Sequence, residues 1–66
     1  MSDAKMELEN ENGKYFVLAG DEAIWFRTEI GPYILMHDLT VYEDRNRAKA
    51  LAMNALKEQG WSEVVL

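Results

Sequence analysis

Residues 43–60, EDRNRAKALAMNALKEQG, are the only stretch of this 66-residue chain in which apolar residues recur with a helical period over several turns. The i, i+3, i+4, i+7, i+8 spacing gathers side chains on one stripe of an α-helix. It is followed here by Ala48, Leu51, Ala52, Ala55 and Leu56. An amphipathic helix of this kind needs an apolar surface to cover, so the rest of the chain is expected to supply a sheet.

The helix has two possible starts and one clear end. Thr40 with Glu43 matches a capping box, which would begin the helix about a turn early, whereas Asp44 as the N-cap would leave the preceding residues extended. Gly60 suits the left-handed position that follows a helix. The sequence favours neither start.

Residues 14–19 and 23–30 are rich in aromatic and β-branched side chains and flank a turn at residues 20–22, which predicts two strands. Proline cannot donate to a strand ladder, so Gly31-Pro32 is expected to break the pairing before a third strand at residues 33–39.

Residues 61–66 are expected to return as a short strand, and residues 1–13 form either a flexible segment or an edge strand. The predicted fold is therefore α+β: an antiparallel three- to four-stranded meander, one helix on one sheet face and a C-terminal strand (β-β-β-α-β). We expect one small domain over residues 1–66, since a chain this short has a small core.

A two-residue turn at Gly31-Pro32 and a three-residue loop at residues 20–22 would decide which side chains share a face. The helix would then cover Phe16, Leu18, Ile24, Phe26 and Leu35. The opposite face would carry a patch with no element left to cover it. This patch is the predicted partner-binding surface: Tyr15, Trp25, Arg27, Glu29, Ile34, Met36 and Asp38.

Exposed apolar patches of several hundred Å² usually mark interaction surfaces, and Trp, Tyr, Met and Arg are enriched in interface cores. Two alternatives stay open for this patch. The final strand, the N-terminal segment or a slipped register would cover it, or a second copy of the chain would.

The net charge is −5, and it is unevenly distributed. Residues 1–44 are strongly acidic, whereas residues 45–66 carry a small excess of bases. The turn and helix-start acids form a predicted acidic surface: Asp21, Glu22, Glu43 and Asp44. Nucleic-acid affinity comes largely from neutralised phosphates, so direct nucleic-acid binding is disfavoured and a basic protein partner is expected.

No catalytic constellation is visible. The chain has no cysteine and one histidine, His37, whose neighbour Asp38 would point to the opposite face of a strand, so no metal site or other cofactor is expected. The glycines are scattered one per turn rather than gathered in a phosphate-binding loop. Paired carboxylates in turns and at a helix start are typical of solvated charge.

The β-β-β-α order resembles that of double-stranded-RNA-binding domains, and β-β-β-α-β resembles small antitoxin domains. The leading helix of the RNA-binding family is missing, and Glu43-Asp44-Arg45-Asn46-Arg47 does not match its lysine-rich helix start. The order of elements is therefore all that the resemblance covers.

We expect a small, acidic, non-enzymatic protein-interaction module in the cytoplasm, without a membrane anchor. Phage inhibitors of nucleic-acid-handling proteins, including anti-CRISPR proteins and DNA mimics, have this size and charge. In that role, carboxylates would stand in for phosphates on a basic partner. The alternatives are an obligate homodimer with a structural or antitoxin-like role and, less favoured, a module like those that bind double-stranded RNA.

Overall fold

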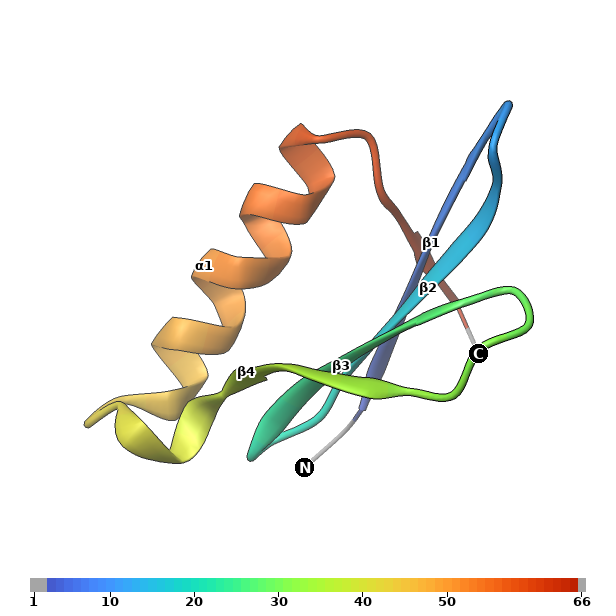
Figure 1. Cartoon of the computed structure of the whole chain (residues 1–66). Helices are drawn as coiled ribbons and strands as arrows, with labels where there is room; N and C mark the ends of the chain where they lie inside the picture. Colours follow the sequence, from blue (N-terminus) through green and yellow to red (C-terminus); the bar gives the residue numbers. More distant parts are fainter. Residues whose placement is uncertain (1–2, 66) are drawn as a thin grey trace.

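A computed structural model describes residues 3–65 and shows a twisted antiparallel sheet with one α-helix on one side (Figure 1). The chain runs in the order β1 (Ala4–Asn10), β2 (Gly13–Ala19), β3 (Ala23–Thr28), β4 (Ile34–Asp38), η1 (Leu39–Val41), α1 (Arg45–Glu58) and β5 (Ser62–Val64). The sheet order is β4-β3-β2-β1-β5. This is the predicted α+β fold.

The N-terminal segment is an interior strand, because β5 pairs with the free side of β1 and itself becomes the edge. The β1–β2 hairpin turns through two residues between Asn10 and Gly13, and Gly13 has a φ of 133° that other residues rarely adopt. The predicted C-terminal strand forms over a shorter span than 61–66, and Leu66 lies outside the described residues, as do Met1 and Ser2.

The predicted strand register is wrong, and this changes which side chains face the helix. Leu18 pairs with Trp25 instead of Ile24, because Asp21-Glu22 is a two-residue turn closed by a hydrogen bond from the Gly20 N–H to the Ala23 carbonyl (2.9 Å). A slip of one residue reverses every side chain of a strand. The helix-facing side of β2 is therefore Tyr15, Val17 and Ala19, while Phe16 and Leu18 point away.

The β3–β4 register also differs from the prediction. The connection spans residues 29–33 instead of only Gly31-Pro32, and Trp25 lies opposite Leu35. The register shifts between Ile24 and Trp25, so one extra residue of β4, Met36, is accommodated there. Leu35 consequently lies on the face away from α1, contrary to the prediction, whereas Met36 packs against the core.

The core lies between α1 and the sheet and consists of Met6, Val17, Ala19, Ile24, Leu39, Leu56 and Trp61. Aromatic rings extend it along the sheet. Tyr15 stacks on Phe26 with ring centroids 6.1 Å apart, and Phe26 meets the edge of Trp61 at 6.3 Å. Trp61 follows the helix after Gln59 and Gly60, so it connects the end of α1 to the sheet.

Asp44 is the N-cap of α1, and its carboxylate accepts a hydrogen bond from the Arg47 N–H at 3.1 Å. The later of the two predicted starts is the correct one. The residues before it do not stay extended throughout, because residues 39–41 form η1. At the other end Gly60 has a φ of 103°, as expected for the residue that follows a helix.

The buried stripe of α1 is rotated relative to the predicted one. Ala48, Lys49, Ala52 and Met53 are partly buried and Leu56 is buried, whereas Leu51 is 58% exposed and Ala55 is also exposed. The predicted stripe of Ala48, Leu51, Ala52, Ala55 and Leu56 leaves Lys49 and Met53 on the outer side of the helix. Met53 packs against the core, and the Lys49 ammonium lies 3.4 Å from the Asp21 carboxylate. Lys49 and Met53 are therefore on the buried side of the helix, where the periodicity placed Leu51 and Ala55.

Candidate interaction sites

The sheet face away from α1, called here the open face, carries one row across all five strands that is apolar except for Lys5. The register places Val64, Lys5, Leu18, Trp25 and Leu35 side by side in this row. Trp25 is 38% exposed and Leu35 is 53% exposed. A second row holds Glu7, Phe16 and Arg27, and a third holds Glu9 and Lys14.

Arg27 is held flat against the second row. Its guanidinium carbon lies 4.2 Å from the centroid of the Phe16 ring and 5.4 Å from that of Tyr33. Its Nη1 donates to the carbonyls of Thr28 (3.1 Å) and Glu29 (3.3 Å). Cation–π contacts and carbonyl acceptors therefore satisfy much of this charge within the molecule, and Tyr33 is kept on the open face.

A shallow depression of about 230 Å³ lies on the open face beside the apolar row. The side chains around it come from four strands and the β3–β4 connection: Lys5, Glu7, Phe16, Arg27, Tyr33 and Val64. The charges of the whole face are nearly balanced, because Lys5, Lys14 and Arg27 stand against Glu7 and Glu9. The open face is thus aromatic, uneven and not acidic.

Carboxylates gather instead at the end of the molecule where α1 begins, a region called here the acidic end. It comprises Asp21, Glu22, Asp38, Glu43 and Asp44. The β2–β3 turn meets η1 through a hydrogen bond from the Leu39 N–H to the Glu22 carbonyl (2.9 Å), and Asp38 pairs with Ala23. Asp21, Glu43 and Asp44 line a single surface depression together with Arg45 and Asn46.

The acidic end also contains bases and local hydrogen bonds. Lys49 pairs with Asp21, and Asp44 caps α1. The Thr40 hydroxyl (2.6 Å) and the Thr40 N–H (3.0 Å) both donate to Asp38 Oδ1, and these bonds lower the pKa of that carboxyl below its ordinary value of 3.8. Arg45 and Arg47 also lie nearby, so the acidic end carries both negative and positive charges, with more acids than bases.

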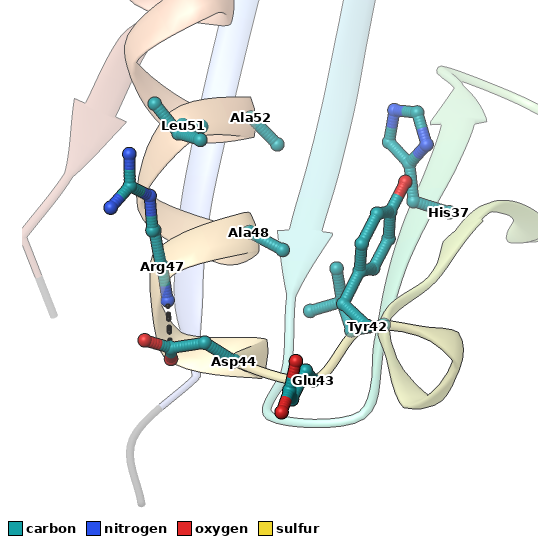
Figure 2. Close-up of a pocket in the computed structure, with 9 residues that line it drawn as sticks. His37, Tyr42, Glu43, Asp44, Arg47, Ala48, Leu51 and Ala52 are labelled. Carbon is teal, nitrogen blue, oxygen red and sulfur yellow. Dashed lines mark hydrogen bonds between the residues drawn. The ribbon is translucent and has the colours of Figure 1, made fainter.

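An apolar cleft of about 480 Å³ opens beside the acidic end, between the first half of α1 and the segment that leads into it. Figure 2 shows Ala48, Leu51 and Ala52 along the helix side, with His37 and Tyr42 across from them. Leu39 is buried beneath, and Glu43, Asp44 and Arg47 complete the lining. The two alanines leave the space that larger side chains would fill.

The structure separates the residues of the predicted partner-binding surface. Trp25 and Arg27 lie on the open face, as predicted, whereas Tyr15 and Met36 pack against the core on the helix-facing side. Ile34 lies opposite Phe26 and therefore points to the helix-facing side, although it is largely exposed. Glu29 is exposed in the β3–β4 connection, and Asp38 belongs to the acidic end.

The four predicted acidic-surface residues do meet at one end of the molecule. Phe16, Leu18 and Leu35 are open-face residues that the predicted register places on the opposite face, and Tyr33 is an open-face residue that the sequence does not single out. Sequence reasoning also missed the cleft. The small residues Ala48 and Ala52, with Leu51 between them in the sequence, are the available signal, but the same alanines equally favour close helix–sheet packing.

Among residues 3–65, no group of three or more His, Cys, Asp or Glu side chains could hold a metal ion. No helix in this described part of the chain is long and apolar enough to cross a membrane. The sequence matches no known family model, and neither the curated proteins nor the solved structures include a significant match.

Proposed function

We propose that this protein is a non-enzymatic interaction module that binds a protein partner with a basic surface through the acidic end and its cleft. One observation carries the proposal: carboxylates from three separate segments gather at the acidic end, and two of them, Glu43 and Asp44, also line an apolar cleft of about 480 Å³. Specific recognition usually combines an apolar pocket with a few polar groups that fix orientation.

In this arrangement the cleft takes an apolar side chain of the partner, which contacts Leu39, Leu51 and the Tyr42 ring. Lysine or arginine side chains beside that anchor meet Glu22 and Glu43, which are exposed. The apolar contact supplies most of the affinity, while the charges speed association and select the partner.

The bases at the start of α1 favour a protein with a defined charge pattern over a general phosphate-binding groove. Arg45, Arg47 and Lys49 lie among the carboxylates, so the acidic end is not a uniform imitation of a nucleic-acid backbone. If the partner uses the bound region to handle nucleic acid, this module acts as an inhibitor by occupying that region.

Affinity capture from an extract of the organism that encodes the chain, at low and high salt, tests this proposal. Glu22→Lys with Glu43→Lys should abolish capture of a specific basic protein, and high salt should weaken capture by the unaltered chain, since exposed charges are screened. Glu11→Lys with Glu58→Lys is the matched control, because it makes the same change in net charge away from the acidic end.

The cleft is tested separately by Leu51→Gln, with Ala50→Gln as the control on an exposed part of the same helix. Leu51→Gln should weaken binding about tenfold, because it removes an apolar contact without affecting the core. Capture that is insensitive to salt, to the Glu22→Lys, Glu43→Lys double variant and to Leu51→Gln would refute the proposal.

A further inference from the structure

We propose that the open face is the interface of a homodimer, and that its occupant is a second copy of this chain. This inference is independent of the function proposed for the acidic end, which lies elsewhere on the molecule. It follows from the composition, the charge and the surface shape of the open face.

The composition is that of an interface core. Trp25, Tyr33 and Leu35 are each between 38% and 53% exposed, and Phe16 and Leu18 lie beside them on β2. Trp, Tyr and Arg are the residue types that carry most of the binding energy in protein interfaces, and Arg27 is already oriented by two rings and two carbonyls. Little side-chain entropy is lost when such a preordered surface is covered.

The charge of the open face favours a second copy over a basic protein. Lys5, Lys14 and Arg27 would repel a basic surface, whereas Glu7 and Glu9 on the same face attract the bases of a copy. In a two-fold interface the same patch faces itself, so a patch with both signs in neighbouring rows is complementary to itself when the axis lies between those rows.

The relief of the face is also self-complementary. The Trp25 and Leu35 side chains are exposed beside the depression of about 230 Å³ that Phe16, Arg27 and Tyr33 help to line. A two-fold axis between Trp25 and the depression places each indole over the depression of the other copy. Both halves of the contact are then present on every chain, and the contact closes at two copies.

The area of the open face indicates how tightly the proposed dimer should associate. Five strands about 4.8 Å apart and about 20 Å long give on the order of 400 Å² of flat area per copy, before the relief of the side chains is counted. This is at the small end of specific interfaces, where dimers dissociate at micromolar concentrations. The fraction of the chain that is dimeric is therefore expected to depend on its concentration.

Sedimentation equilibrium from about 1 to about 500 µM measures this directly. The unaltered chain should pass from monomer to dimer, and Trp25→Asp should weaken the dimer about thirtyfold or more, as expected for a central aromatic residue. Val41→Asp is the control, because Val41 is exposed outside the open face, the acidic end and the cleft. Circular dichroism confirms that each variant is folded.

A charge exchange tests whether the face pairs with itself. One variant carries Glu7→Lys and Glu9→Lys, and the other carries Lys5→Glu and Lys14→Glu. Each should be monomeric alone, because like charges then meet across the two-fold axis, and an equimolar mixture should form dimers. Recovery of the dimer in the mixture would require the open faces to contact each other.

A monomer throughout the concentration range would overturn the inference, as would a dimer that Trp25→Asp leaves intact. Neither result would affect the function proposed for the acidic end, because the Glu22, Glu43 and Leu51 variants test that function on residues outside the open face. Conversely, a chain that forms the dimer but captures no basic protein would support the homodimer and refute the function proposed for the acidic end.

Discussion

Arg27 illustrates how a single residue acquires its role from tertiary contacts. In the sequence it is one of few bases among many acids, and strand alternation alone places it on the predicted partner-binding surface. In the structure it lies between the Phe16 and Tyr33 rings and donates to two carbonyls, so it organises the open face. Lysine could not substitute fully, because it lacks the planar guanidinium that stacks and donates in two directions.

Asp38 gives a prediction at the same scale. The two hydrogen bonds from Thr40 lower its pKa, so its contribution to stability is fully present above the ordinary value of 3.8 and is lost as the pH falls through the lower pKa of the folded state. Asp38→Asn should therefore reduce the free energy of unfolding at neutral pH but not in strong acid.

Urea unfolding of both proteins between about pH 7 and about pH 2.5 measures this difference. Asparagine is also a good capping residue, so the comparison isolates the charge rather than the cap. A difference between the two proteins that stays constant over the whole pH range would contradict the assignment.

At the scale of the element, α1 shows the limit of reading a helix from its own periodicity. The pattern Ala48, Leu51, Ala52, Ala55 and Leu56 correctly identifies a helix but misplaces its buried stripe. Lys49 occupies a partly buried position because its aliphatic stem can pack while its ammonium reaches Asp21. The side chain of Leu51 is then left on the wall of the cleft.

This rotation predicts unequal costs for two truncations on the same helix. Met53→Ala should lower the free energy of unfolding by about 1–2 kcal/mol, since a partly buried side chain in contact with the core is removed. Leu51→Ala should cost less than about 0.5 kcal/mol, because Leu51 is mostly exposed. Thermal or urea unfolding of the two variants measures both values. A larger loss for Leu51→Ala than for Met53→Ala would contradict the rotation and support the buried stripe predicted from periodicity.

At the scale of the whole molecule, the two candidate surfaces differ in charge and lie on different parts of the fold. The single helix covers one side of the sheet, which leaves the other side with an apolar row and nearly balanced charges. The turn between β2 and β3, the end of β4 and the start of α1 converge at the acidic end. The two interactions proposed above would therefore use different surfaces and would not compete.

If the open face joins two copies, the thermal stability of the chain depends on its concentration. The midpoint of thermal unfolding should rise by about 3 °C for each tenfold increase in concentration above the dissociation constant, because dimerisation stabilises only the folded state. Trp25→Asp should unfold at one temperature over the same range. A midpoint that does not change with concentration in the unaltered chain would contradict this prediction.

Much of the fold follows from local sequence. Val, Ile and aromatic residues in residues 14–19 and 23–30 favour strands, and Gly60 ends the helix; these preferences act within a few residues and are readable without tertiary contacts. The choice of Asp44 over Thr40 as the helix cap was not readable, because both offer a suitable oxygen to an N-terminal N–H.

The candidate sites depended on facts that the sequence leaves open. Trp25 and Arg27 were assigned to an exposed face correctly, but Tyr15 and Met36 were not, because side-chain direction reverses with each residue of register. The register itself depends on whether a turn contains two residues or three and on where a bulge is placed. Those choices differ little in local energy, and burial of Val17, Ala19 and Ile24 selects among them.

Local chemistry thus accounts for the identity and order of the strands and the helix, whereas tertiary packing decides which faces are left for a partner. Strand and helix preferences arise from backbone sterics and neighbouring side chains, which act within each segment. The open face, the acidic end and the cleft each join residues from segments far apart in the chain. Their composition is set by register and by helix rotation, which only the burial of the whole core determines.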